Sequence, residues 1–146
     1  MAVFFDYFSA PDDRAAASAL AEGPEDAGFD TVYVKSIDPA VLLGQAVALL
    51  LREPFSRIDE YPRFCDPVTP PEEENTFVLT VPDEVRDALA DATRERLAEI
   101  CIPWSQAEEF YGPADPDWLT GFLNELAAVA VRARPLGHRL YCRVLV

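Results

Sequence analysis

The stretch DPDWLTGFLNELAAVAVRARPLGHRLYCRVLV, residues 115–146, decides the fold class because it joins a long helix to a strand. Asp115-Pro116 places an N-cap residue before a proline at the first helical position, which predicts a helix start. Apolar side chains follow at helical spacing to about residue 134, and this spacing predicts one buried face. That face contains Trp118, Leu119, Phe122, Leu123, Leu126 and Val129.

A strand is predicted directly after this helix. Pro135 and Gly137 end the helix, and residues 138–146 then alternate between the two sides of an extended chain. One side carries Leu140, Cys142 and Val144, and the other carries Arg139, Tyr141 and Arg143. This terminal strand either pairs with the N-terminal strand or lies at an exposed edge, where its arginines would oppose pairing with another chain.

The residues before this unit alternate between strands and helices. Aromatic and β-branched residues predict strands at 2–8, 29–35 and 76–81. Helices are predicted at 9–22, at 38–51 after Asp38-Pro39, and at 82–100. The capping box Ser105–Glu108 predicts a further short helix that ends near Gly112.

This irregular alternation is typical of the α+β class. We predict a single α+β domain over residues 1–146, with a four-stranded, mostly antiparallel or mixed sheet and about five helices packed on it.

Residues 53–75 interrupt the pattern with five prolines and the acidic run Glu72-Glu73-Glu74. Connections of this length are uncommon in compact domains, so the segment is either a functional lid or only a loop. Phe55, Ile58, Tyr61 and Phe64 recur every three residues, which predicts a short helical turn packed on the domain. The three glutamates are either a divalent-cation site or a solvated tip.

The charge balance is strongly acidic, with 26 Asp and Glu against 12 Lys and Arg and a net charge of −14. This charge opposes binding to nucleic acid or to an anionic membrane, because phosphates would be repelled. It suits a basic protein partner or divalent cations, although solubility alone also accounts for it. Lys35 is the single lysine beside many Ala, Arg, Asp and Pro residues, a composition expected of a GC-rich bacterial genome.

The sequence predicts a cytoplasmic protein. The N-terminal apolar run lacks a basic region and is interrupted by Asp6, and the apolar stretch 41–51 is too short to span a bilayer. Cys65, Cys101 and Cys142 are widely spaced and odd in number, so we expect reduced thiols in place of a disulfide framework.

Catalytic and cofactor motifs are missing from the sequence. The six glycines form no phosphate-binding loop, and no nucleophile elbow is present. His138 is the single histidine, so a multi-histidine metal site is impossible. Cys142 follows it by four strand positions, about 13 Å, which is too far for a catalytic hydrogen bond. We therefore predict no cofactor and no metal site, and the sequence favours a non-catalytic protein.

Six residues are candidates for binding a ligand: Tyr61, Phe64, Trp104, Glu108, Glu109 and Tyr111. Carboxylates among aromatic rings recognise basic or sugar-like ligands through charge, stacking and cation–π attraction. We expect the proline-rich segment to roof a pocket lined by the aromatic members. The alternative is that Trp104, Phe110 and Trp118 anchor the helix pair to the core while the two glutamates face water.

Two stretches resemble the YfbM-like family, a bacterial domain family of unknown function. They are VYVKSIDPAVLLGQAVALLL, residues 32–51, and WLTGFLNELAAVAVRARPLGHRLYCRVLV, residues 118–146. The shared features are a lysine before an apolar helix and a final helix that turns into a last strand. The resemblance implies a compact α+β fold without an established activity, and no functional residues are carried over.

Three functions therefore stay open. The first is an acidic interaction or regulatory module, such as an inhibitor or immunity protein that neutralises a basic partner. The second is a small-molecule binding protein with an aromatic and carboxylate pocket. The third is an enzyme in which Glu108 or Glu109 performs acid–base chemistry. Either a monomer or a homodimer is compatible with the sequence.

Overall fold

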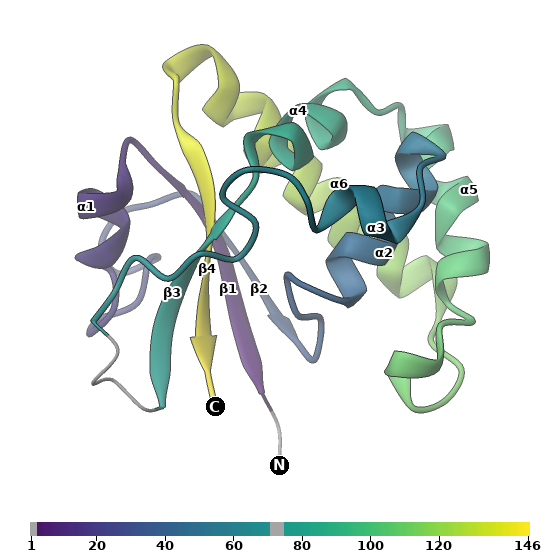
Figure 1. Ribbon diagram of the computed structural model, residues 1–146, viewed down its shortest axis with the longest axis horizontal. Helices are drawn as coiled ribbons and strands as arrows, with labels where there is room; N and C mark the ends of the chain where they lie inside the picture. The colour runs from purple at the N-terminus through teal and green to yellow at the C-terminus, as the bar shows by residue number, and fades with distance from the viewer. Residues whose placement is uncertain (1–2, 71–74) are drawn as a thin grey trace.

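The computed structural model describes residues 3–70 and 75–146, and it confirms the α+β fold (Figure 1). Four strands form one antiparallel sheet in the order β2-β1-β4-β3. They are β1 (Phe4–Ala10), β2 (Thr31–Lys35), β3 (Thr76–Val81) and β4 (Arg139–Leu145). The described residues form six α-helices, namely α1 (Asp13–Ala17), α2 (Leu42–Leu51), α3 (Phe55–Ile58), α4 (Asp83–Asp91), α5 (Arg94–Trp104) and α6 (Pro116–Ala133).

The first and last strands are neighbours in the middle of the sheet. β1 pairs with β4 from Phe4↔Leu145 to Ala10↔Arg139, so the two ends of the chain lie at the same end of the sheet (Figure 1). The pairing confirms one of the two arrangements expected for the terminal strand. Arg139 and Arg143 therefore protect no edge, because β4 lies between β1 and β3.

The main core lies between one face of the sheet and α2, α4, α5 and α6 (Figure 1). Five of the six predicted apolar residues of α6 are buried there: Leu119, Phe122, Leu123, Leu126 and Val129. Each such side chain contributes about 1.5–3 kcal/mol by leaving water. Trp118 is the exception and the prediction for it is wrong: 51% of the residue is exposed, although Leu119 beside it in the same turn of α6 is buried.

A smaller core covers the opposite face of the sheet. Phe8 and Tyr141 are buried there beneath Ala16 and Ala19, which belong to α1 and the turns that follow it. The predicted helix 9–22 is wrong in length, since α1 ends at Ala17. The Ser18 hydroxyl donates to Ala15 O at 2.5 Å, and a serine that bonds the local backbone in this way competes with helix continuation.

The proline-rich segment covers the outer edge of β3. A short helix, α3, confirms the predicted helical turn near Phe55. Residues 65–69 then run along β3, where Cys65 N–H donates to Thr80 O at 3.1 Å and Val68 N–H donates to Val78 O at 2.9 Å. Prolines suit an edge position because they need no ladder donor. The segment therefore extends the sheet at this edge.

The predicted helix 82–100 is two helices in the structure. The backbone is extended at Ala92 and Thr93, and the Thr93 hydroxyl caps α5 by accepting from Arg96 N–H at 3.1 Å. α5 continues through Trp104, so the predicted helix start at Ser105 is also wrong. Ser105 is the C-cap of α5, and its hydroxyl donates to Ile102 O at 2.7 Å.

Candidate functional site

The structure does not gather the six predicted ligand-binding residues around one cavity. Tyr61 and Phe64 pack half-buried against the main core after α3. Trp104 is buried in that core, and its indole Nε1–H donates to Leu42 O at 2.9 Å. Glu108, Glu109 and Tyr111 are exposed beyond the end of α5. Glu109 and Tyr111 line one cavity and Trp104 lines another, and a ligand role for these residues stays a prediction.

Two of the six residues, Glu109 and Tyr111, line a pocket of about 470 Å³ at the end of the sheet where β2 runs into α2. Asp38 and Ser36 line its opposite wall. The remaining lining is apolar and consists of Val3, Phe5, Val41, Leu42 and Phe110. We call this cavity the acidic pocket, because two carboxylates and no basic side chain are among its lining residues.

The Asp38 side of the pocket is rigid. The Asp38 carboxylate accepts from Val41 N–H at 2.6 Å and from Leu42 N–H at 3.1 Å, which caps the approach to α2. The sequence predicts that the helix starts at Asp38-Pro39, but α2 begins only at Leu42. Asp38 therefore caps the residues that lead into the helix and is not its N-cap. Ser36, just before, has a left-handed φ of 68°. The carboxylate is consequently held in place by backbone donors before any ligand arrives.

The opposite side is the short 3₁₀ turn Glu108–Phe110. Phe110 anchors this turn, because its ring packs edge-on against Trp104 with centroids 5.6 Å apart. Tyr111 follows in the left-handed conformation, at φ 56°, and is 98% exposed. A bulky residue in this conformation is uncommon and costs about 1–3 kcal/mol. The turn thus presents Tyr111 and Glu109 to solvent at the pocket rim.

Several acidic groups of the molecule form ion pairs. In α4, Asp83 pairs with Arg86 and Arg139, and Asp91 pairs with Arg134 at 2.8 Å. The sequence from 97 to 131 contains six acidic residues and no Lys or Arg, and Glu99 among them pairs with Arg96. Within the described part of the chain, Glu108 and Glu109 make no ion pair. Unpaired carboxylates therefore lie at the acidic pocket and next to it in the sequence.

The thiols are poorly suited to nucleophilic chemistry. All three cysteines are free, and burial raises the pKa of each. The pKa of Cys65 rises to about 12, and Asp38 and Asp66 add to the effect of burial. The thiolate is the reactive form, so these side chains are inert at neutral pH.

Within residues 3–70 and 75–146, no three His, Cys, Asp or Glu side chains come together as a metal site. No helix in the same ranges has the length and apolar character to cross a membrane. The candidate cation site at Glu72, Glu73 and Glu74 lies outside the described residues.

Asp38 lines the acidic pocket, although the sequence predicts only a helix start at this residue. Its position before Pro39 is a helix-start signal, and nothing in the spacing relates it to Glu109, which lies 71 positions later. For Glu109 the sequence does contain a signal, because this residue lies in the stretch 97–131, which has no Lys or Arg. Comparison of the chain with protein-family models, curated proteins and solved structures found no match, so the resemblance to the YfbM-like family stays a prediction.

Proposed function

We propose that the protein is an interaction module that binds a basic protein partner through the acidic pocket. The observation that carries this proposal is that one cavity of about 470 Å³ is lined by two carboxylates, Asp38 and Glu109, and by Tyr111, which is 98% exposed. A lysine or arginine side chain of the partner would enter between the carboxylates and lie against the Tyr111 ring. Carboxylate pairing and cation–π attraction both favour such a side chain.

The surroundings of the pocket support the same assignment. The net charge of −14 raises the rate of encounter with a positively charged protein. Exposed tyrosines are among the residues that dominate binding energy in protein interfaces. Val41 at the rim is 40% exposed and offers an apolar contact beside the charged centre. Small acidic inhibitors and immunity proteins work by such charge complementarity, and this chain fits that class.

The test is affinity capture from lysate of the source organism at two salt concentrations, with four tagged proteins: the natural chain, Glu109→Lys, Tyr111→Ala and Glu22→Lys. Glu22 is exposed and outside the pocket, and its reversal changes the net charge by the same amount. We expect a stoichiometric basic protein on the natural chain and on Glu22→Lys. This partner should not be captured by the two pocket variants. At the higher salt concentration it should not be captured by any of the four proteins, because salt screens exposed charges.

Two results would contradict the proposal. One is a partner captured equally by all four proteins, since the acidic pocket would then not be its binding site. The other is the absence of any stoichiometric partner at low salt. A circular dichroism spectrum of each variant establishes that a lost partner does not reflect a lost fold.

A further inference from the structure

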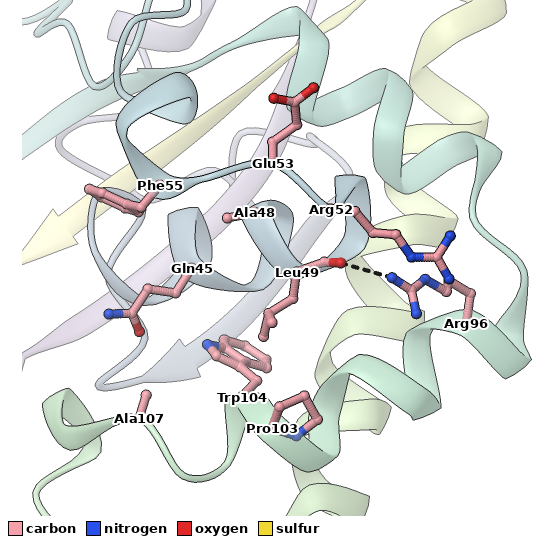
Figure 2. A pocket seen from close by; sticks show the side chains of 10 residues that line it. All are labelled: Gln45, Ala48, Leu49, Arg52, Glu53, Phe55, Arg96, Pro103, Trp104 and Ala107. Carbon is pink, nitrogen blue, oxygen red and sulfur yellow. Dashed lines mark hydrogen bonds between the residues drawn. The ribbon is translucent and has the colours of Figure 1, made fainter.

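A second cavity lies among the helices, and its lining residues differ from those of the acidic pocket. It has a volume of about 540 Å³ and is bounded by α2, by α3 and by α5 with the residues that follow it (Figure 2). Its walls are mainly apolar and consist of Ala48, Leu49, Phe55, Pro103, Trp104 and Ala107. The volume lies in the range of about 300–1,000 Å³ that is typical of small-molecule sites.

The walls of this cavity are set by specific contacts. A Cβ atom added to Gly44 would lie 2.7 Å from Cε2 of Phe55, so the glycine lets the Phe55 ring pack against α2. The Trp104 ring is held by its bond to Leu42 O. Both aromatic rings therefore have defined positions before a ligand binds, which lowers the entropic cost of binding.

The polar groups of the cavity are arranged at two ends. Figure 2 shows the guanidinium groups of Arg52 and Arg96 at the same end, beyond Leu49. Arg96 is already engaged, since it donates to Leu49 O at 2.8 Å and to Glu99 at 3.1 Å. Arg52, the left-handed C-cap of α2, has no side-chain hydrogen bond or ion pair within residues 3–70 and 75–146. Its guanidinium is free to bind an anion.

Two further polar side chains complete the lining. Glu53 is the acidic residue there, and it pairs with Arg57 at 3.8 Å. The Gln45 side chain lies at the other end from the arginines (Figure 2), and its Oε1 is buried with no hydrogen-bond partner among the described residues.

We propose that this cavity binds a small organic acid with an apolar, ring-sized body. The body packs against Trp104, Leu49 and Phe55, and the carboxylate accepts hydrogen bonds from Arg52. Charge complementarity selects the anion, because two arginines flank one end of the apolar cavity. The lining residues of this site differ from those of the acidic pocket, for which we propose a cationic side chain.

The two tryptophans provide a direct readout. Trp104 lines the cavity, whereas Trp118 lies in α6 outside it, so in a proton–nitrogen NMR spectrum the Trp104 indole N–H signal reports on the cavity and the Trp118 signal is the internal reference. Because Trp104 also contacts Phe110 of the acidic pocket, the Arg52→Gln variant identifies which of the two sites the acid occupies. Trp118→Phe assigns the signals, and its 51% exposure makes the substitution tolerable. The probes are 2-naphthylacetate and its neutral analogue 2-naphthylacetamide.

We expect 2-naphthylacetate to shift the Trp104 signal saturably, with the Trp118 signal unchanged, and to bind at least about tenfold more tightly than the amide. Arg52→Gln should remove this preference for the acid. Arg94→Gln changes the net charge equally at an exposed position outside the cavity and should leave it intact.

An unmoved Trp104 signal with both probes would overturn the proposal. Equal affinity for acid and amide would also overturn it, since the cavity would then be an apolar groove open to peptides or other neutral ligands. Unchanged acid binding in Arg52→Gln would overturn the role of Arg52. Because Arg52 is exposed, this variant is expected to fold, and the remaining NMR signals check that directly.

Discussion

Tyr141→Phe removes one hydroxyl from the network that holds the second face of the sheet. The Tyr141 hydroxyl donates to Asp13 Oδ1 at 2.7 Å. Arg63 donates to both oxygens of the same carboxylate, at 2.8 and 3.2 Å. The network thus connects three segments that are far apart in the sequence, namely β4, α1 and the proline-rich segment.

The expected magnitude follows from exposure. A hydrogen bond to a charged group contributes about 1.5–3 kcal/mol when it is protected from water. Tyr141 is fully buried, but the Asp13 side chain is 50% exposed and keeps its Arg63 partner. Water can therefore replace part of the lost bond, and we expect the free energy of unfolding to fall by about 1 kcal/mol, or about 4 °C in melting temperature.

A double-mutant cycle measures this interaction in urea titrations followed by circular dichroism. The four proteins are the natural chain, Tyr141→Phe, Asp13→Asn and the double variant, with Tyr33→Phe as the control for removing a hydroxyl from a 58% exposed tyrosine. We expect the control to change stability by less than about 0.5 kcal/mol. If Tyr141→Phe costs the same with and without Asp13, the reasoning is refuted, because the hydroxyl would not act through that carboxylate.

The same network makes a signed prediction for pH. Hydrogen bonds from Arg63 and then Tyr141 lower the pKa of Asp13 in the folded protein. Its contribution to stability is therefore complete above the unfolded pKa of about 3.9, and it is lost as the pH falls through the lower folded value. The stability difference between the natural chain and Asp13→Asn should shrink from pH 5 to pH 2. A constant difference over that range would contradict the assigned pKa shift.

Three further predictions concern single positions. Thr93→Ala removes the cap that accepts from Arg96 N–H, so urea titrations should show a loss of about 1 kcal/mol; an unchanged midpoint would mean that α5 does not need this cap. Trp104→Phe leaves Leu42 O without its donor and a space beside it, which should cost about 2 kcal/mol or more. An unchanged melting temperature in calorimetry would contradict it. Burial raises the pKa of Cys65 to about 12, so in the folded protein at pH 8 only about one Cys65 thiol in ten thousand is thiolate. We therefore expect it to react with a thiol reagent at this pH only after unfolding. Rapid labelling of the native protein would disprove this.

Local patterns were sufficient for much of the fold. The alternation before residue 82 and after residue 138 predicted β3 at Thr76–Val81 and β4 at Arg139–Leu145. Asp115-Pro116 correctly placed the start of α6, and its apolar spacing identified five buried residues. These features depend on neighbours within about four positions, so sequence alone contains the information that determines them.

Local patterns misplaced the features that depend on distant contacts. The predicted helix 82–100 runs through Ala92 and Thr93, where the backbone is extended, and α4 and α5 pack on α6 as two separate helices. Trp118 fits the apolar spacing of α6, yet it is half-exposed because its side of the first turn is left uncovered, unlike that of Leu119. Periodicity describes which side of a helix a residue occupies, but not whether another element covers that side.

The sequence by itself determined the strands, the final helix, the negative charge and the stretch without Lys or Arg. Only the tertiary structure decided which residues share a cavity: it placed Asp38 and Glu109 in the lining of one pocket, without Tyr61 and Phe64, and placed Arg52 and Arg96 at one end of another. The physical reason is the distance along the chain over which the determining interactions act. Helices and strands follow from hydrogen bonds and side-chain spacing along a few residues, whereas a binding site depends on how whole elements pack, which the burial of the entire core determines.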